Sequence, residues 1–187
     1  MAALRVSAVR KTILTMREFF VLIHDDRDDL AVVSDYEMGE FDLMSLWTGE
    51  RMTSSIPADV RVWVENGEPT DYMGNPISWQ IVSDRLWSII QPLVGNDCQV
   101  LEAPLYDEKS RMPISGYVLL NPTRCVPAAK KVASISDLHL DIAQIPGELN
   151  IFRLKESSTV VLVSDALVQA VSHKNLKGLA FLRTKTA

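Results

Sequence analysis

IFRLKESSTVVLVSDALVQAVSHKNLKGLAFLRT, residues 151–184, predicts a strand, a capped helix and a second strand. Residues 160–163 form a short apolar, β-branched run that is typical of a strand buried on both faces. Ser164 can accept hydrogen bonds from the free N–H groups of a helix start, and Asp165 places negative charge at its positive end. Gly178 is predicted to end this helix. This segment is predicted to pack in the core, and it contains no evident catalytic or binding residues.

The same pattern occurs earlier in the chain. Residues 81–90, IVSDRLWSII, share Val, Ser, Asp and Leu in register with residues 162–171, LVSDALVQAV. A helix is therefore predicted to begin after Ser83, to end at Gly95 and to lead into a strand over residues 98–106. Such a match arises either from internal duplication or from the frequent use of Ser-Asp at helix starts. In both cases the two helices are predicted to lie on a shared sheet.

Further strands follow from β-forming runs bounded by turn residues. The predicted strands are residues 18–24, 30–33, 60–64, 116–120, 138–142 (an edge strand) and 149–155. The pattern favours an α+β fold, with a mixed, largely antiparallel sheet and two main Ser-Asp-capped helices. Residues 16–187 are predicted to form a single domain, since 187 residues suffice for one substantial core.

The first fifteen residues have three bases and no acid. This composition is typical of an organelle transit peptide. A simpler interpretation is that Met16 starts the domain, because it directly precedes the first predicted strand. Residues 1–15 are then an N-terminal extension that packs poorly.

Composition also bears on the class of protein. A net charge of -5 argues against a general nucleic-acid binder, which needs a positive surface. No apolar run approaches the roughly 20 residues of a membrane-spanning helix. Cys98 and Cys125 lack CxxC spacing and are predicted to be buried free thiols.

Motifs for catalysis, metals or cofactors are lacking in the sequence. There is no GxGxxG or GxxxxGK[ST] to hold phosphates. The aspartates after His24 lack the glycine and glutamate of a calcium-binding EF-hand loop. We therefore predict no catalytic residue, metal or cofactor. The alternative is a small hydrolase or metal-dependent enzyme around His139, because Asp137 and Asp141 would share its strand face.

The most distinctive feature is acidic. Residues 24–42 contain eight acids and one arginine. Such a run is either a solvated loop or a docking surface for a basic protein, which a negative patch attracts. The second interpretation gives as candidate partner-binding residues Asp25, Asp26, Asp28, Asp29, Glu37 and Glu40.

Several motifs resemble those of a known family, the immunity proteins of bacterial polymorphic toxin systems first described from myxobacterial genomes. The similar segments are IFRL at residues 151–154, V-S-D-x-L at 163–167, L-x-G-L-x-F at 176–181, VSDRL at 82–86 and GYxxLN at 116–121. The resemblance covers roughly residues 76–181. All of these segments are caps, turns and core strands, so it supplies no catalytic residue.

The resemblance implies an α+β, cytoplasmic protein that binds and neutralises a cognate toxin by direct protein-protein inhibition. The toxin would be encoded by an adjacent gene, and neither nucleic acid nor membrane would be a partner. The oligomeric state is left open. The alternative to this interpretation is a regulatory module that binds a protein other than a toxin.

Overall fold

Both α-helices begin at a Ser-Asp pair, as predicted. Helix α1 covers Asp84–Val94 and helix α2 covers Asp165–Val171. The Ser83 hydroxyl accepts a hydrogen bond from the backbone N–H of Leu86 at 3.1 Å, and Ser164 caps α2 in the same way. Each serine thereby satisfies one of the N–H groups that have no partner within the helix.

The two helices end differently. Gly95, with a φ of 49°, ends α1 as predicted. By contrast, the prediction that Gly178 ends α2 is wrong. The hydroxyl and the N–H of Ser172 both bond to Val168 O, which closes the last turn of α2 without a glycine. Gly178 instead lies directly before strand β14 (Leu179–Arg183).

The computed structural model describes residues 17–65, 67–132 and 134–186, so the predicted extension over residues 1–15 lies outside them. The described chain is a single small α+β domain with mostly antiparallel strands. Its strands form four sheets, where the sequence predicted one.

A five-stranded sheet contains, in spatial order, β14, β1 (Phe19–His24), β13 (Ser157–Ser164), β12 (Ile151–Leu154) and β9 (Cys125–Val126). A four-stranded sheet contains β4 (Tyr72–Met73), β5 (Gln80–Ser83), β8 (Tyr117–Pro122) and β6 (Cys98–Glu102). One three-stranded sheet contains β2 (Val33–Glu37), β3 (Arg61–Val64) and β7 (Leu105–Asp107). The other contains β10 (Ala129–Val132), β11 (Leu138–Leu140) and β15 (Lys185–Thr186). Short 3₁₀-helices are η1 (Leu43–Trp47), η2 (Gly95–Asp97), η3 (Ile135–Asp137) and η4 (Ile142–Gln144).

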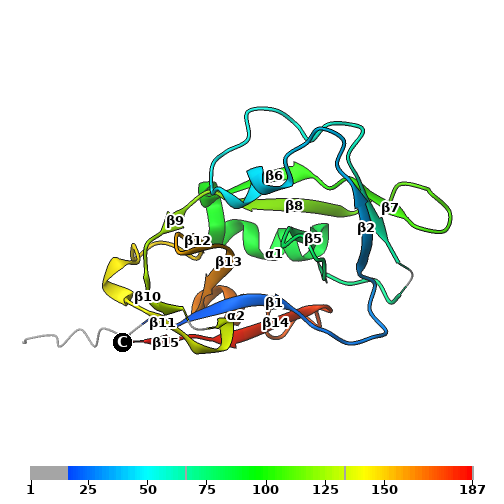
Figure 1. Cartoon of the computed structure of the whole chain (residues 1–187). Coiled ribbons are helices and arrows are strands. Elements are labelled where there is room, and N and C mark those ends of the chain that lie inside the picture. The colour runs from blue at the N-terminus through cyan, green and yellow to red at the C-terminus, as the bar shows by residue number, and fades with distance from the viewer. Residues whose placement is uncertain (1–16, 66, 133, 187) are drawn as a thin grey trace, which may run out of the picture.

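The helices do not share a sheet, contrary to the prediction. Helix α1 follows β5 of the four-stranded sheet, and α2 follows β13 of the five-stranded sheet. Helix α1 lies beside β5 and β8, and α2 lies beside α1 and β13 (Figure 1). Leu86 and Ile90 of α1 are buried in one apolar core with Leu167 and Val171 of α2 and with Val163. This core holds the N-terminal and C-terminal parts of the chain together.

Three strand predictions need correction. Residues 98–106 form two strands in different sheets, β6 and β7, because Ala103 and Pro104 separate them. The predicted edge strand over 138–142 is β11, which pairs with β10 on one side and β15 on the other. The predicted strand over 30–33 contributes only Val33 to β2, which continues to Glu37.

The two cysteines have different environments. Cys98 is buried, as predicted, and burial raises the pKa of its thiol to about 12. Cys125 is exposed, so that half of the prediction is wrong. Its strand, β9, has only two residues at the margin of the five-stranded sheet and buries Val126 instead.

No helix in the described part of the chain is long and apolar enough to cross a membrane.

Candidate protein-binding surface

Backbone hydrogen bonds fix the loop between β1 and β2, which carries four of the six candidate residues. Asp25 N donates to Gly178 O at 3.0 Å, at the start of β14. Glu68 N donates to Asp29 O at 2.7 Å, and Ala31 N donates back to Glu68 O. Residues 25–29 are therefore held at both ends, and their carboxylates project from a defined stretch of backbone.

The four aspartates of this loop differ in their partners. Arg27 pairs with Asp25 at 3.0 Å and lies 4.0 Å from Asp29. Asp26 and Asp28 are exposed and have no ion pair within the described residues. Four carboxylates against one guanidinium leave a formal charge of -3: Asp26 and Asp28 supply two of these charges, and the third remains because Asp25 and Asp29 share Arg27.

Glu37 has a different environment, on the outer face of the β2-β3-β7 sheet. It accepts a hydrogen bond from Trp63 Nε1 at 3.2 Å and pairs with Arg61 at 3.5 Å. Two guanidinium groups stack on aromatic rings here: Arg111 lies 4.2 Å from the Trp63 ring centre, and Arg61 lies 5.8 Å from that of Tyr106. The charge of Glu37 is thus balanced locally by bases.

Glu40 lies in a hollow of about 740 Å³ with three further carboxylates, those of Asp42, Glu50 and Asp59. None of the four forms an ion pair with another described residue. Arg51 also lines the hollow, but its guanidinium donates to Asn96 O at 2.6 Å. The hollow is therefore strongly acidic, and solvent alone balances most of its charge.

Side chains of the neighbouring sheet hold the walls of this hollow in place. Gln99 accepts from Met52 N at 2.8 Å and donates to Met52 O at 2.9 Å. Asn121 donates to Glu50 O at 2.8 Å. Trp79, which is 1% exposed, donates to Leu43 O at 3.3 Å. The backbone of Glu50 and Met52, in the wall of the hollow, is accordingly bound to β6 and β8 before any partner binds.

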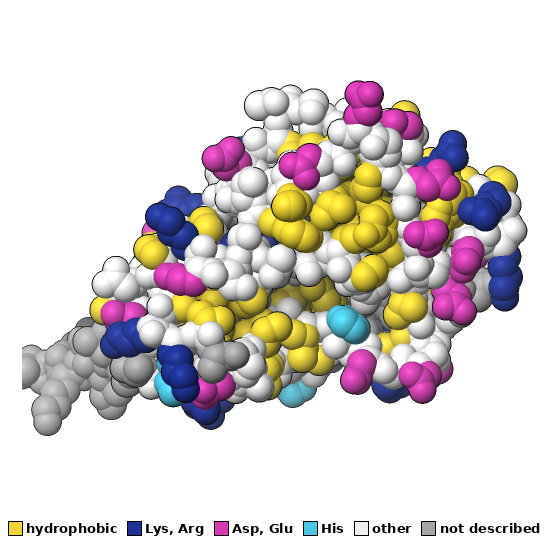
Figure 2. Space-filling model, viewed as in Figure 1, with side chains coloured by type: hydrophobic (Ala, Val, Ile, Leu, Met, Phe, Trp, Pro, Cys, Tyr) yellow, Lys and Arg dark blue, Asp and Glu magenta, His cyan; other side chains and the backbone are white. Residues whose placement is uncertain are grey.

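The structure thus brings the six candidate residues to three places. Asp25, Asp26, Asp28 and Asp29 lie together, whereas Glu37 is on a sheet face and Glu40 is in the hollow. Acidic side chains follow one side of the molecule, over β2 and the loop before it, with basic ones among them (Figure 2). Sequence reasoning missed Glu50 and Asp59, although both belong to the acid-rich stretch between Asp25 and Asp71. Within the described ranges, no three His, Cys, Asp or Glu residues are arranged to hold a metal ion.

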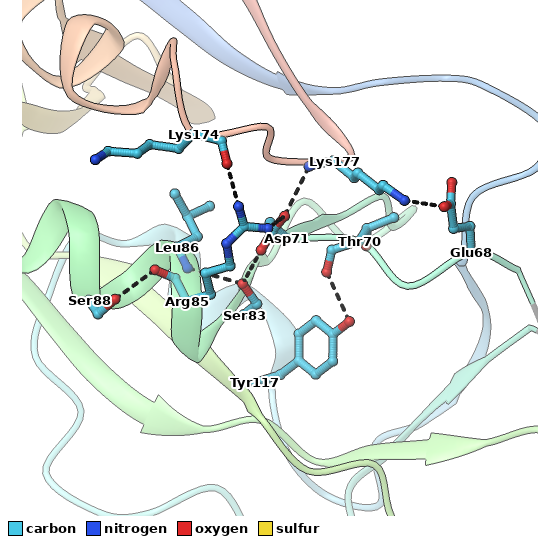
Figure 3. A network of polar contacts seen from close by, with 10 residues as sticks. All are labelled: Glu68, Thr70, Asp71, Ser83, Arg85, Leu86, Ser88, Tyr117, Lys174 and Lys177. Atoms are coloured by element: carbon cyan, nitrogen blue, oxygen red, sulfur yellow. Dashed lines mark hydrogen bonds and ion pairs between the residues drawn. The ribbon is translucent and has the colours of Figure 1, made fainter.

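Asp71, an acidic residue outside the candidate surface, has a structural role that the sequence did not reveal. Its side chain is 10% exposed. One oxygen accepts from the Ser83 hydroxyl at 2.7 Å, and the other accepts from Lys177 N at 3.0 Å (Figure 3). Arg85 lies 3.5 Å away, and it also donates to Lys174 O. Both carboxylate oxygens are thus engaged within the fold, and they join the start of α1 to the loop after α2.

Three of the five motif segments identified in the sequence meet around this carboxylate. Ser83 comes from the VSDRL segment and Lys177 from the LKGLAF segment (Figure 3). Tyr117, from the GYVLLN segment, donates its hydroxyl to Thr70 O at 2.9 Å, one residue before Asp71. Burial and the nearby Asp71 charge raise the pKa of Tyr117. These motifs therefore hold the fold together, as expected for caps and turns.

The cluster around His139 is a surface ion-pair network. His139 Nε2 lies 3.1 Å from Asp137 Oδ1, and Lys131 and Lys185 each contact the same carboxylate at 2.7 Å. These two lysines and then the histidine hold the pKa of Asp137 well below its usual range. Asp141 does not join them: it caps η4 and lies 3.9 Å from Lys130. Of the three residues of the enzyme alternative, the structure brings together only His139 and Asp137, and two lysines contact the carboxylate of this pair.

A scan of protein-family models found no match to the chain, and a search of curated proteins found none either.

Proposed function

We propose that this protein is an immunity protein, which binds a cognate bacterial toxin and neutralises it by covering a basic surface of that toxin. The observation that carries the proposal is the concentration, in the N-terminal third, of carboxylates that form no ion pair with a described residue. They are Asp26 and Asp28 in the β1–β2 loop, and Glu40, Asp42, Glu50 and Asp59 in the hollow.

The negative charge of this surface supports the proposal. A dense negative surface attracts a cationic protein, raises its association rate and opposes the approach of other acidic proteins. Toxins that cleave or bind nucleic acid need a basic active site to contact phosphates. A rigid acidic surface is complementary to such a site, and binding needs no cofactor. In this proposal the toxin-producing cell keeps the protein in its cytoplasm, where the toxin would otherwise act.

The second candidate is a regulatory module that uses the same surface to bind a basic protein other than a toxin. The same acidic surface favours this second candidate, because surface charge identifies the chemistry of a partner and not its biological role. The identity of the neighbouring gene separates the two.

The test is co-expression of this protein with the product of the adjacent gene in a sensitive bacterial strain. We expect that product alone to stop growth, the pair to restore it, and both proteins to copurify as a stable complex. A neighbour that is harmless alone, or that kills in spite of this protein, would contradict the immunity function. Copurification with a harmless neighbour would favour the regulatory module.

A further inference from the structure

The backbone pairing between β1 and β13 stops before either strand ends. β1 pairs with β13 only from Phe19 to Val21, whereas its pairing with β14 continues to His24. The same register would place His24 opposite Thr159, but this pair is not formed. The separated ends line a groove of about 540 Å³. Apolar side chains gather on both sides of a hollow in the face of the molecule that Figure 2 shows.

Backbone polar groups face this opening. Glu18 O accepts from Asp165 N on the β13 side at 2.9 Å, whereas Asp25 N donates to Gly178 O on the β14 side at 3.0 Å. The hydrogen-bonding direction alternates along a strand. Residues an even number of positions after Glu18, up to His24, therefore direct their N–H and C=O groups toward β13. At His24 no strand of the described chain pairs with β1 on that side.

The lining of the groove indicates what chemistry can fill it. Leu22, Trp79 and Val160 give it apolar walls, and Asp25 and Asp26 lie at one end. No lysine or arginine is among the described residues that line it. An extended peptide would meet the N–H and C=O groups of His24, which no described strand pairs on that side, together with apolar walls and the carboxylates of Asp25 and Asp26.

We propose that an extended segment of the partner inserts into this groove as an added strand beside β1, with a lysine or arginine side chain at Asp26. This inference rests on the proposed function and specifies how its partner is held. Main-chain hydrogen bonds to β1 give affinity, while the apolar walls and the two carboxylates select the sequence of the inserted segment. Asp26 contributes more than Asp25, because Arg27 already balances the latter.

The direct test is amide hydrogen exchange of the full chain, alone and with the product of the adjacent gene. We expect exchange at His24, Thr159 and Val161 to slow at least tenfold in the complex, because the backbone amides of these residues face the groove. The amide of Asp25 already donates to Gly178 O and serves as the internal reference, with little change expected.

The matched variants are Asp26→Lys and Glu148→Lys, which make the same charge change at exposed positions near opposite ends of β1. We expect the first to weaken the complex at least tenfold and the second to leave it unchanged. A complex that forms without protection of the groove amides would overturn the inserted strand and leave the proposed function standing. If no complex forms while both proteins are folded, the proposed function fails, and the inserted strand fails with it.

Discussion

Gly178 is required by two independent features of its surroundings. Its φ is 77°, and a Cβ atom there would lie 2.2 Å from Tyr72 O and 2.9 Å from the Cβ of Thr70. We expect Gly178→Ala to lower the free energy of unfolding by on the order of 2–5 kcal/mol, since the left-handed backbone costs about 1–2 kcal/mol and overpacking about 1–3 kcal/mol. Urea unfolding followed by circular dichroism measures this loss.

Gly116 provides the matched control, because its φ is 87° but no atom lies within 4 Å of the position of its Cβ. Gly116→Ala should cost only the backbone strain, about 1–2 kcal/mol. Equal losses for the two variants would mean that the close approach of Gly178 to β4 does not contribute to stability.

Arg153 is a charged residue in an apolar core. It is 1% exposed, its Nη1 donates to Ser158 O at 2.8 Å, and its Nε has no partner. No carboxylate of the described chain forms an ion pair with it, and burial lowers its pKa to about 10. Below that pH the folded chain holds a positive charge less favourably than the unfolded chain does. The charge of Arg153 therefore costs stability at neutral pH.

We expect Arg153→Met, which keeps much of the side-chain volume, to raise the free energy of unfolding by about 1–3 kcal/mol. Arg124→Met is the control, because Arg124 is exposed and precedes the β9 strand beside Arg153. That variant should stay within about 0.5 kcal/mol of the parent protein. A large loss of stability in Arg153→Met would show instead that the guanidinium supports the core through its hydrogen bonds.

At the scale of single residues, the sequence predicted caps better than burial. Ser83 and Ser164 were found from local pattern alone, because an N-cap acts on N–H groups two or three residues away. The burial of Arg153 was not predicted, nor was the structural role of Asp71, which depends on a segment distant along the chain. Lys177 is far from Asp71 in the chain, and no local pattern encodes their contact.

Among the elements, β11 joins β10 and the C-terminal β15 in a small sheet, and Asp137 links them by charge. Lys131 of β10 and Lys185 of β15 both contact its carboxylate. The pKa of Asp137 is lower in the folded chain than in the unfolded chain. Its ion pairs therefore stabilise the fold above the unfolded pKa, about 4, and this stabilisation is lost as the pH falls through the folded pKa.

Asp137→Asn should accordingly unfold at a lower urea concentration than the parent protein at pH 7, and the two midpoints should converge as the pH falls toward 2. Unfolding curves at several pH values and low salt measure this. Asp28→Asn is the control, since Asp28 is exposed and forms no ion pair with a described residue. A gap between the midpoints that stays constant with pH would contradict a contribution from these ion pairs.

Most elements were predictable because periodicity and turn residues are local signals. Their assembly was not. The pairing of β1 with both β13 and β14 joins the first described strand to two strands near the C-terminus. The 98–106 run reads as one strand, although Ala103 and Pro104 divide it between two sheets. Local pattern contains no information about which edge a strand will join.

At the scale of the whole molecule, the sequence predicted the charge of the candidate surface but not its shape. The excess of acids over residues 24–42 was evident, as was the arginine within it. The sequence did not show that Arg27 and Arg61 would balance Asp25 and Glu37, or that Glu50 and Asp59 would join Glu40 in a hollow. Both outcomes depend on how the chain folds back after β2.

This distribution predicts which charges steer a basic partner. Asp26→Asn combined with Asp28→Asn removes two carboxylates without local partners, changing the net charge from -5 to -3. Glu102→Gln combined with Glu148→Gln makes the same change at exposed sites outside the candidate surface. Stopped-flow association with the adjacent gene product, at several salt concentrations, should show at least a tenfold slower rate and a weaker salt dependence for the first pair. Because the total charge of the two variants is equal, a difference can come only from where the charge lies. If both pairs slow association equally, net charge alone attracts the partner, and the β1–β2 loop does not orient it.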